Sequence, residues 1–309
     1  MINILFAAPD TRWEEYKDTL PRLLDDIGIK ADLRRDHDPE NTDYIVYAPN
    51  PDLTDFAPYT HTKAVLSLWA GVETIVTNKT LTQPLTRMVD NGLTEGMVEW
   101  VIGHTLRHHL GMDTHIVNPN HGWHAVAPPL ARNRSVGVLG LGELGTACAR
   151  ALTALNFNVI GWSRREKSLD GIMCQSGAEG LEATLAVSEI LILLLPLTSS
   201  TQNLLNADRL SRVPKGAVII NPGRGALIDD DALIDALNEG QIGHATLDVF
   251  RTEPLPWDHP FWPHENVTVT PHIASETRTE TAAQSVAENI RRSEAGEPLL
   301  HLVNRSAGY

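Results

Sequence analysis

The stretch Ser135–Arg150, SVGVLGLGELGTACAR, determines how the rest of the sequence is interpreted. An apolar, strand-forming run leads into Gly140, Gly142 and Gly145 and then into a helix of small residues. Gly140 permits a tight turn, Gly142 lets a pyrophosphate approach the backbone, and Gly145 lets the helix pack closely on the strand. Because a strand precedes and a helix follows, this G-x-G-x-x-G pattern indicates a dinucleotide-binding turn with phosphates at the helix N-terminus. The alternative is a glycine-rich turn without a ligand.

The next predicted strand, residues 158–162, ends in a basic run that bears on the choice of cofactor. An NAD site usually carries Asp or Glu near this position, about twenty residues after the glycines, to bind the ribose hydroxyls. Here the run contains Ser163, Arg164, Arg165 and Lys167, interrupted by Glu166. A hydroxyl and guanidinium groups can hold a 2′-phosphate through charge-assisted hydrogen bonds. The run therefore predicts NADP(H) as the preferred cofactor, with NAD(H) possible; the alternative is a solvated basic loop.

Composition limits the classes of protein that the chain can belong to. With 309 residues, 42% hydrophobic and 21% charged, the chain is long enough for two globular domains. The formal net charge of −14 argues against nucleic acid and anionic membranes as partners. No run is long and apolar enough to predict a membrane span, and the N-terminus reads as a strand rather than a signal peptide. Two cysteines, Cys148 and Cys174, predict no disulfide framework and favour a cytoplasmic location.

Strand-like and helix-like segments alternate along the chain, which predicts parallel α/β sheets. Residues 13–27 are helix-like, with an interruption at Pro21, and residues 94–112 and 275–292 predict two long helices. The first long helix leads from an N-terminal domain into a second one, and the other can return the chain to the first domain. From Ser135 onward, the second domain is a series of βα units.

The predicted strand at residues 64–68 ends in Trp69, Ala70 and Gly71. Ligands of open parallel sheets bind beyond the carboxyl ends of the strands. Two small residues there leave backbone N–H groups open to an anion such as a substrate carboxylate. An ordinary strand-to-helix turn is an equally good interpretation of this segment alone.

Several histidines lie on or after the first long helix. The spacing of His104 and His108 allows a metal pair, but no H-E-x-x-H pattern and no ligand set of Cys or carboxylates accompanies them. We therefore expect no metal site, and we expect surface or interdomain positions for His104, His108, His109, His115, His121 and His124.

Three further predicted strand ends carry Arg224, Glu253 and His272. Arg224 can grip a carboxylate with two parallel hydrogen bonds and polarise the adjacent carbonyl. His272 can deliver a proton near neutral pH. Glu253 can orient the imidazole and favour its protonated form. Each residue alone has a structural explanation, but together at strand ends they predict hydride transfer to the carbonyl of a small acid.

These motifs give the chain a resemblance, over nearly its whole length, to the D-isomer-specific 2-hydroxyacid dehydrogenases, especially their glyoxylate/hydroxypyruvate reductase branch. The most specific segments are Val138–Gly145, Gly161–Arg164, Leu194–Thr198, Asn221–Gly225, Leu247–Pro256 and Thr270–Ala274. The resemblance implies two Rossmann-like α/β domains, flavodoxin-like and NAD(P)-binding, with parallel sheets and two long linking helices. It implies a substrate-binding (catalytic) domain of residues 1–98 and 276–309 and an NAD(P)-binding domain of residues 99–275.

The resemblance also assigns roles to residues. Arg224, Glu253 and His272 match the catalytic residues, and Trp69, Ala70 and Gly71, with Arg224, match the substrate site. Asp248 matches a residue that contacts the nicotinamide carboxamide. The cofactor-binding positions that it implies are Gly140, Gly142, Glu143, Leu144, Gly145, Ser163, Arg164, Arg165, Lys167, Leu195, Pro196, Thr201, Pro222, Gly223, Asp248, His272 and Ala274.

The chain departs from the family pattern at three positions. Trp69 stands where a small residue is usual, Glu73 where Asp is common, and Pro222 where a less rigid residue is usual. Trp69 argues against bulky substrates if its ring points into the cleft.

The sequence thus predicts a homodimeric enzyme that reduces small 2-keto acids, glyoxylate or hydroxypyruvate, with NADPH and with His272 as general acid. Two alternatives remain open. One is a catalytically weak NADP(H)-sensing protein on the same framework, which the intact catalytic trio disfavours. The other is a relative that acts on another small acid, such as formate or phosphite.

Overall fold

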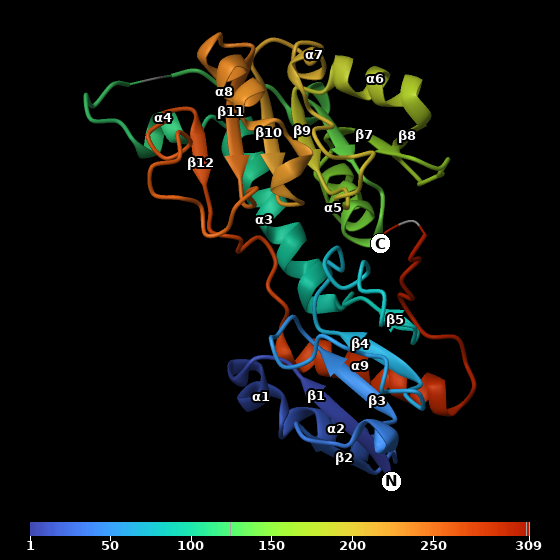
Figure 1. The fold of residues 1–309 in the computed structure, drawn as a ribbon. Helices are drawn as coiled ribbons and strands as arrows, with labels where there is room; N and C mark the ends of the chain where they lie inside the picture. Colours follow the sequence, from blue (N-terminus) through green and yellow to red (C-terminus); the bar gives the residue numbers. More distant parts are fainter. Residues whose placement is uncertain (124, 307, 309) are drawn as a thin grey trace. The chain divides into compact units, whose positions relative to one another are not determined.

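The computed structural model describes residues 1–123, 125–306 and 308, and it divides into two compact units. Unit 1 comprises residues 1–93 and 276–309, and unit 2 comprises residues 94–275. The chain therefore passes from unit 1 into unit 2 and back again (Figure 1). Each unit is an α/β domain with one parallel sheet, as the alternation of strands and helices predicts.

Unit 1 is built on a five-stranded parallel sheet of order β2-β1-β3-β4-β5. The strands are β1 (Ile2–Ala7), β2 (Ala31–Arg34), β3 (Tyr44–Tyr47), β4 (Ala64–Ser67) and β5 (Leu85–Thr86). The helices are α1 (Asp10–Tyr16), α2 (Thr19–Asp26), the 3₁₀ turn η1 (Pro39–Asn41) and α9 (Thr279–Glu294). α9 contributes alanines and aliphatic residues to one core cluster with β1, β3 and β4, so both segments of the chain build this unit.

The sequence suggests that Pro21 interrupts the first helix, but the structure shows no break at this residue. The break falls at residues 17–18, between α1 and α2, and Pro21 lies in the first turn of α2. The first N–H groups of a helix have no partner within the helix, so proline is tolerated there.

The segment after α9 forms hydrogen bonds with residues around β5 in unit 1. The Val303 amide donates to the Leu85 carbonyl at 2.8 Å, and the Arg87 amide donates to the His301 carbonyl at 3.1 Å. The Arg305 guanidinium donates to the carbonyls of Leu81 and Gln83. This segment therefore closes over the edge of the sheet that β5 forms.

Unit 2 is built on a seven-stranded parallel sheet of order β12-β11-β10-β9-β6-β7-β8. The strands are β6 (Ser135–Leu139), β7 (Asn158–Ser163), β8 (Met173–Ser176), β9 (Ile190–Leu193), β10 (Ala217–Asn221), β11 (Ile242–Leu247) and β12 (Val267–Val269). The helices are α3 (Asn91–His109, which begins in unit 1), α4 (Asp113–Ile116), α5 (Glu143–Ala154), α6 (Gly177–Val187), α7 (Ala207–Leu210) and α8 (Asp230–Asn238), with 3₁₀ turns η2 (Ala131–Asn133) and η3 (Gly225–Leu227).

The strand order of unit 2 reverses between β6 and β9. After β6 the chain adds β7 and β8 on one side, and it then adds β9 to β12 on the other. Ligands of such sheets bind beyond the carboxyl ends of the strands at this reversal. The glycine-rich turn lies there, directly after β6.

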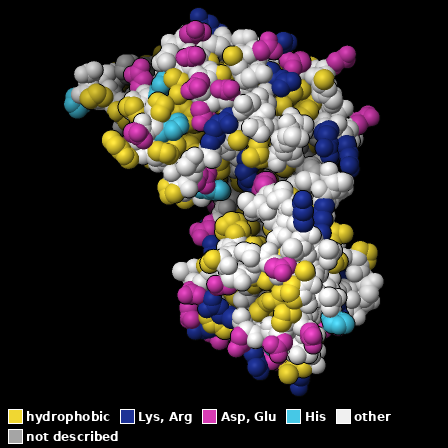
Figure 2. All heavy atoms as spheres, in the orientation of Figure 1, with side chains coloured by type: hydrophobic (Ala, Val, Ile, Leu, Met, Phe, Trp, Pro, Cys, Tyr) yellow, Lys and Arg dark blue, Asp and Glu magenta, His cyan; other side chains and the backbone are white. Residues whose placement is uncertain are grey.

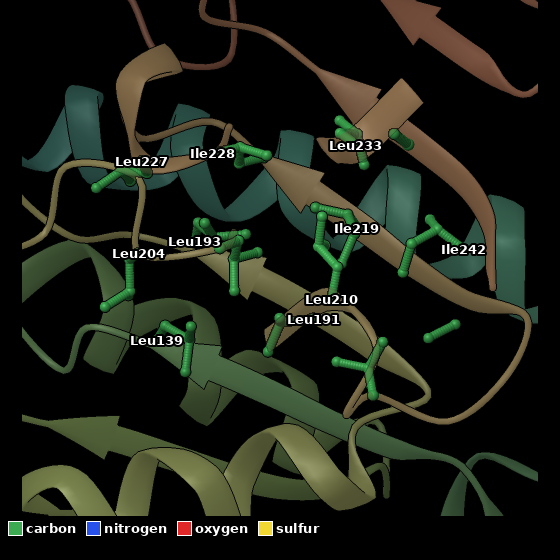
Figure 3. Close-up of a cluster of buried hydrophobic side chains, with 14 of the residues drawn as sticks. Leu139, Leu191, Leu193, Leu204, Leu210, Ile219, Leu227, Ile228, Leu233 and Ile242 are labelled. Carbon is green, nitrogen blue, oxygen red and sulfur yellow. The ribbon is translucent and has the colours of Figure 1, made fainter. Parts of the chain in front are cut away.

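The central strands of unit 2 are apolar on both faces because helices cover both sides of a parallel sheet. β9 is fully buried, as its continuous apolar run predicts. Figure 3 shows Leu191 and Leu193 of β9 packed among leucine and isoleucine side chains of neighbouring strands and loops. This core fixes the strand ends from which the site is built.

We expect surface or interdomain positions for the α3 histidines, and none of the three is an exposed surface residue; His104 and His108 are half-buried. His109 is buried, and its ring packs edge-on against Phe157. His108 packs against His244, and its Nε2 lies 2.8 Å from the Thr246 hydroxyl. The imidazole is apolar enough to serve as core material when it is neutral. His115 and His121 are exposed, and His124 lies outside the described residues.

Figure 2 shows acidic side chains scattered over the visible face of each unit, as the net charge of −14 requires. Among the described residues, no helix combines the length and hydrophobicity that crossing a membrane requires. The described residues also contain no group of three or more His, Cys, Asp or Glu side chains suited to a metal ion.

Candidate active site

The glycine-rich turn has the geometry that a pyrophosphate needs. Gly140 has φ of 104°, a left-handed conformation that a side chain would strain, and a Cβ there would lie 2.4 Å from the Leu194 carbonyl oxygen. A Cβ on Gly145 would lie 1.7 Å from the Gly140 oxygen, so only glycine lets α5 approach β6 this closely. A Cβ on Gly142 would meet nothing within 4 Å. Gly142 thus faces open space at the N-terminus of α5, where an anion can approach.

The N-terminus of α5 also leaves donors for a ligand. Gly142 is its N-cap residue, and no side chain caps the helix there. The first N–H groups of a helix lack partners within the helix and attract anions. Glu143 is exposed and Leu144 is half-buried in this first turn. The residues present therefore fit a dinucleotide phosphate.

The basic run after β7 lies beside this turn. The Trp162 carbonyl accepts the Gly140 amide at 2.8 Å, and the Lys167 ammonium donates to the Leu141 carbonyl. The Ser163 side chain is buried, and its hydroxyl donates to the Arg165 carbonyl at 2.6 Å. Both guanidinium-bearing residues, Arg164 and Arg165, are exposed. The loop thus places cations next to the glycine-rich turn.

The turn after β9 carries Leu195, Pro196 and Thr201. Leu195 is buried, whereas Pro196 is half-buried. The Thr201 hydroxyl donates to the Pro196 carbonyl at 2.7 Å and accepts the Thr198 amide at 2.8 Å. Thr201 therefore closes this loop, which lies next to the glycine-rich turn because Leu194 approaches Gly140.

The turn after β10 carries Arg224 and is shaped by Asn221. The Asn221 Oδ1 accepts the Gly223 amide at 3.1 Å, and its Nδ2 donates to the Arg224 carbonyl at 2.9 Å. Pro222 and Gly223 are buried, and Arg224 is half-buried. A Cβ on Gly225 would lie 2.1 Å from the backbone of Phe250. The turn of Arg224 therefore packs directly on the loop that follows β11.

Asp248, at the end of β11, is fully buried and organises the loop after β12. Its Oδ1 accepts the Thr270 hydroxyl at 2.5 Å and the Ile273 amide at 2.9 Å, and its Oδ2 accepts the Ala274 amide at 2.8 Å. The Asp248 carbonyl also accepts the His272 amide at 2.9 Å. Hydrogen bonds to the carboxylate compensate its burial. Asp248 thus holds both sides of His272.

His272 and Glu253 form a direct pair. The His272 Nδ1 lies 2.7 Å from the Glu253 Oε2, with side chains 52% and 35% exposed. The other carboxylate oxygen of Glu253 accepts the Phe250 amide at 2.8 Å. The Nδ1–H bond to a carboxylate orients the ring and presents Nε2 outward. The backbone of His272 has φ of 54°, an uncommon left-handed conformation for a residue with a side chain.

Unit 2 therefore brings the turns of Arg224, Glu253 and His272 together at the carboxyl edge of its sheet, as their positions in the sequence suggest. The sequence reasoning missed Asn221 and Thr270 as residues that shape the site. Asparagine directly before a Pro-Gly turn was the available signal, since its side chain often hydrogen-bonds to the backbone two residues later.

In unit 1, Trp69, Ala70 and Gly71 follow β4. The Trp69 ring is 44% exposed, and Ala70 and Gly71 are half-buried. The Trp69 amide donates to the Ser67 hydroxyl at 3.1 Å, and the Trp69 carbonyl accepts the Met88 amide at 3.0 Å. These two hydrogen bonds hold the backbone of Trp69 in place directly after β4.

Comparison with known proteins places this geometry in a family. Residues 101–274 match the family model described as "D-isomer specific 2-hydroxyacid dehydrogenase, NAD binding domain". Over the full length of both proteins, the chain is 37% identical to the glyoxylate/hydroxypyruvate reductase A of Serratia proteamaculans and 36% identical to that of Yersinia enterocolitica.

Solved structures agree. A D-isomer specific 2-hydroxyacid dehydrogenase from Xanthobacter autotrophicus, in complex with NADPH and MES, superposes with a TM-score of 0.92 at 40% identity, over 99% of each chain. The NADPH-dependent glyoxylate/hydroxypyruvate reductase of Sinorhizobium meliloti, in complex with NADP and sulfate, has a TM-score of 0.87 at 32% identity, over 100% of each chain. The chain therefore belongs to the family of D-isomer-specific 2-hydroxyacid dehydrogenases.

Proposed function

We propose that this enzyme reduces small 2-keto acids, with glyoxylate and hydroxypyruvate as its substrates and NADPH as its cofactor. The observation that carries this proposal is the His272–Glu253 pair, which lies at the same edge of the sheet as the glycine-rich turn. Relatives with 36–37% identity over the full chain bear the name of this activity. Their name supports the choice of substrate, and the geometry of unit 2 supports the chemistry.

The residues of unit 2 divide the work of the reaction. When bound, the cofactor supplies a hydride to the keto carbon. His272 donates a proton from Nε2 to the keto oxygen, so that the carbonyl becomes a hydroxyl group. Glu253 accepts a hydrogen bond from Nδ1 and thereby orients the ring with Nε2 toward the substrate. Arg224 binds the carboxylate of the substrate and polarises the adjacent carbonyl.

In unit 1, we assign binding of the substrate carboxylate to the backbone N–H groups of Ala70 and Gly71. These residues follow the buried strand β4, where small side chains leave the backbone accessible. Trp69 limits the size of the group attached to the keto carbon. By this division of labour, residues 1–98 and 276–309 form the substrate domain and residues 99–275 form the cofactor domain.

NADPH rather than NADH is the proposed cofactor because the end of β7 carries cations and no carboxylate at the ribose position. We assign the main contact with the 2′-phosphate to Arg164, which is exposed beside the glycine-rich turn. Lys167 and Arg165 add positive charge. Because the chain has a net charge of −14, an anionic cofactor needs such local cations at its binding site. The Xanthobacter and Sinorhizobium proteins were solved with NADPH and NADP, respectively.

We also propose that the enzyme is a cytoplasmic homodimer. The location is supported by the two free cysteines, which suit a reducing compartment. The dimer is supported by the segment after α4, drawn in green in Figure 1, where apolar side chains are exposed to water. The exposed apolar residues of this segment are Val117, Trp123, Val126 and Leu130, and Ile116 at the end of α4 is exposed beside them in sequence.

A substrate panel tests the function. Purified enzyme is mixed with NADPH and with glyoxylate, hydroxypyruvate, pyruvate or 2-ketobutyrate, and the loss of NADPH absorbance is followed. We expect turnover to be greatest with glyoxylate and hydroxypyruvate. Binding of NADPH without turnover of any acid would instead favour a cofactor-sensing protein. Reduction of NADP⁺ by formate or phosphite would favour the other alternative.

A further inference from the structure

Asn221 is buried at the end of β10, with 1% of its surface exposed. Both polar groups of its side chain are used within one turn. The carbonyl oxygen accepts the Gly223 amide, and the amide nitrogen donates to the Arg224 carbonyl. An acceptor and a donor at this length of side chain are found together only in asparagine, because aspartate lacks the donor and serine is shorter.

The backbone of Asn221 continues this connection into the neighbouring strand. Its carbonyl accepts the Asp248 amide at 3.1 Å. Asp248 in turn binds the loop on both sides of His272 through its carboxylate and its carbonyl. Asn221 therefore belongs to one buried network that extends from the turn of Arg224 to the loop of His272.

The Arg224 turn has little freedom to relax if this network changes. Gly225 packs against the Phe250 backbone at a distance that excludes even a methyl group. The Phe250 amide is the donor that holds Glu253. The Arg224 guanidinium is tied to the same turn, because its Nη1 donates to the Gly223 carbonyl at 2.6 Å. A change in the turn after β10 is consequently transmitted to this guanidinium and to the loop that carries Glu253.

We infer that Asn221 is a positioning residue, which fixes the Arg224 guanidinium for the carboxylate of the substrate without contacting the substrate itself. The inference rests on the proposed role of Arg224. Since Asn221 acts through the substrate-binding arginine, its loss weakens the binding of 2-keto acids more than the binding of NADPH. A residue needed only for folding would instead lower the amount of active enzyme and leave KM unchanged.

The test is Asn221→Asp, which keeps the acceptor for Gly223 but replaces the donor to the Arg224 carbonyl with a carboxylate oxygen. We measure KM for glyoxylate, the Kd of NADPH, and the affinity of the enzyme–NADPH complex for oxamate, a carboxylate analogue of the substrate. One lost hydrogen bond in a buried turn predicts a rise of about tenfold in KM and in the oxamate Kd. The Kd of NADPH should change by less than about threefold.

Asn206→Asp is the matched control. Asn206 caps α7, where its side-chain oxygen accepts the Arg209 amide at 3.0 Å. Aspartate serves equally well at an N-cap, so this variant should keep the parental KM. If Asn221→Asp does not fold, Asn221→Ser, whose shorter side chain leaves the Arg224 carbonyl without the amide donor, is measured in the same way.

A double-mutant cycle with Arg224→Lys then shows whether Asn221 acts through Arg224. If it does, the effect of Asn221→Asp on oxamate affinity shrinks in the Arg224→Lys background. The inference would be overturned if the two substitutions reduced oxamate affinity independently, so that their effects multiplied, or if Asn221→Asp left KM unchanged. In either case, turnover by the parent enzyme would still support the proposed function. A parent enzyme without turnover and without oxamate binding would overturn both.

Discussion

The Nδ1 of His272 and the Oε2 of Glu253 lie 2.7 Å apart, although the two residues are separated by 19 positions in the sequence. The pair forms because Glu253 follows β11 and His272 follows β12, and these strands are parallel neighbours. The carboxylate fixes one ring nitrogen and leaves the other for a substrate. In the proposed reaction, this pair places His272 to donate a proton to the substrate.

Replacing His272 with Gln should remove proton donation while leaving the cofactor site intact. We expect kcat for glyoxylate to fall by about 10²–10⁴-fold, the usual contribution of a general acid. The Kd of NADPH, measured by quenching of protein fluorescence, should stay within about twofold of the parental value. Glu253→Gln should produce a smaller loss of kcat. A His272→Gln enzyme with a near-parental rate would exclude His272 as the acid.

Replacing Arg164 with Ala should weaken NADPH binding selectively. A charge-assisted hydrogen bond contributes about 1.5–3 kcal/mol, so KM for NADPH should rise by about one to two decades while KM for NADH hardly changes. Ser163→Asp should shift the preference toward NADH by repelling the 2′-phosphate. Arg165→Ala controls for general loss of positive charge. Equal weakening of both cofactors by Arg164→Ala would mean that the basic run is only a solvated loop.

Two glycines of the cofactor turn should respond in opposite ways to the same substitution. Gly145→Ala forces a Cβ against the Gly140 carbonyl and should reduce the free energy of unfolding by about 3 kcal/mol or more. Gly142→Ala has open space around the new methyl group and should retain the parental Tm, but it should weaken NADPH binding. Thermal melts and NADPH titrations of both variants make the comparison. Loss of stability in Gly142→Ala would contradict the open geometry.

Stability should fall as the pH drops below neutrality because two partly buried imidazoles are held in neutral form. Burial, reinforced by neighbouring positive groups, lowers the pKa of His108 to about 3 and that of His244 to about 4. In the unfolded chain both titrate near about 6.5. Below that pH the unfolded state binds more protons than the folded state, so the free energy of unfolding decreases from about pH 6.5 toward about pH 4.

Urea unfolding at about pH 7.5, 6.5 and 5.5 measures this decrease. The charged and titratable groups that influence the two imidazoles are Arg107, Asp113, His104 and His264. His244→Gln should make the loss of stability with pH less steep, because one titrating group is removed. His115→Gln, at an exposed position, should leave the pH dependence unchanged. A parental midpoint that does not vary over this range would contradict the prediction.

Trp123 tests the proposed dimer. Its side chain is 95% exposed within the apolar segment after α4. Trp123→Ser should shift the enzyme toward the monomer, which sedimentation velocity would detect at micromolar protein concentration. Trp257→Ser is the control, because Trp257 is 89% exposed but belongs to the loop after β11. A parent enzyme that sediments as a monomer would exclude the homodimer.

Much of the fold follows from the sequence because its signals are local. The apolar runs of β6, β9 and β10 and the glycines between β6 and α5 specify strand, turn and helix without help from distant residues. Strands β5 and β8 were not predicted. β5 has two residues, and β8 is an edge strand whose four residues, MCQS, do not alternate between apolar and polar, so neither has a recognisable hydrophobic pattern.

The site is predictable in part for the same reason. The strand ends identify Arg224, Glu253 and His272 as candidates, whereas their roles stay predictions until the variants are measured. The sequence could not reveal that Asp248 uses both carboxylate oxygens on the loop after β12. That arrangement depends on contacts between residues more than twenty positions apart. The sequence also could not show that the α3 histidines pack against other side chains, because histidine occurs at both buried and exposed positions.

The two-segment construction of unit 1 has a consequence for biosynthesis. Strands β1, β3 and β4 are translated before unit 2, but the helix that covers their apolar face, α9, is translated only after it. Unit 2 is continuous from residue 94 to residue 275, so it can fold while unit 1 still waits for α9. During that interval the strands of unit 1 lack the helix that buries their apolar side chains in the folded protein. Slow translation of the codons for unit 2 would lengthen the interval.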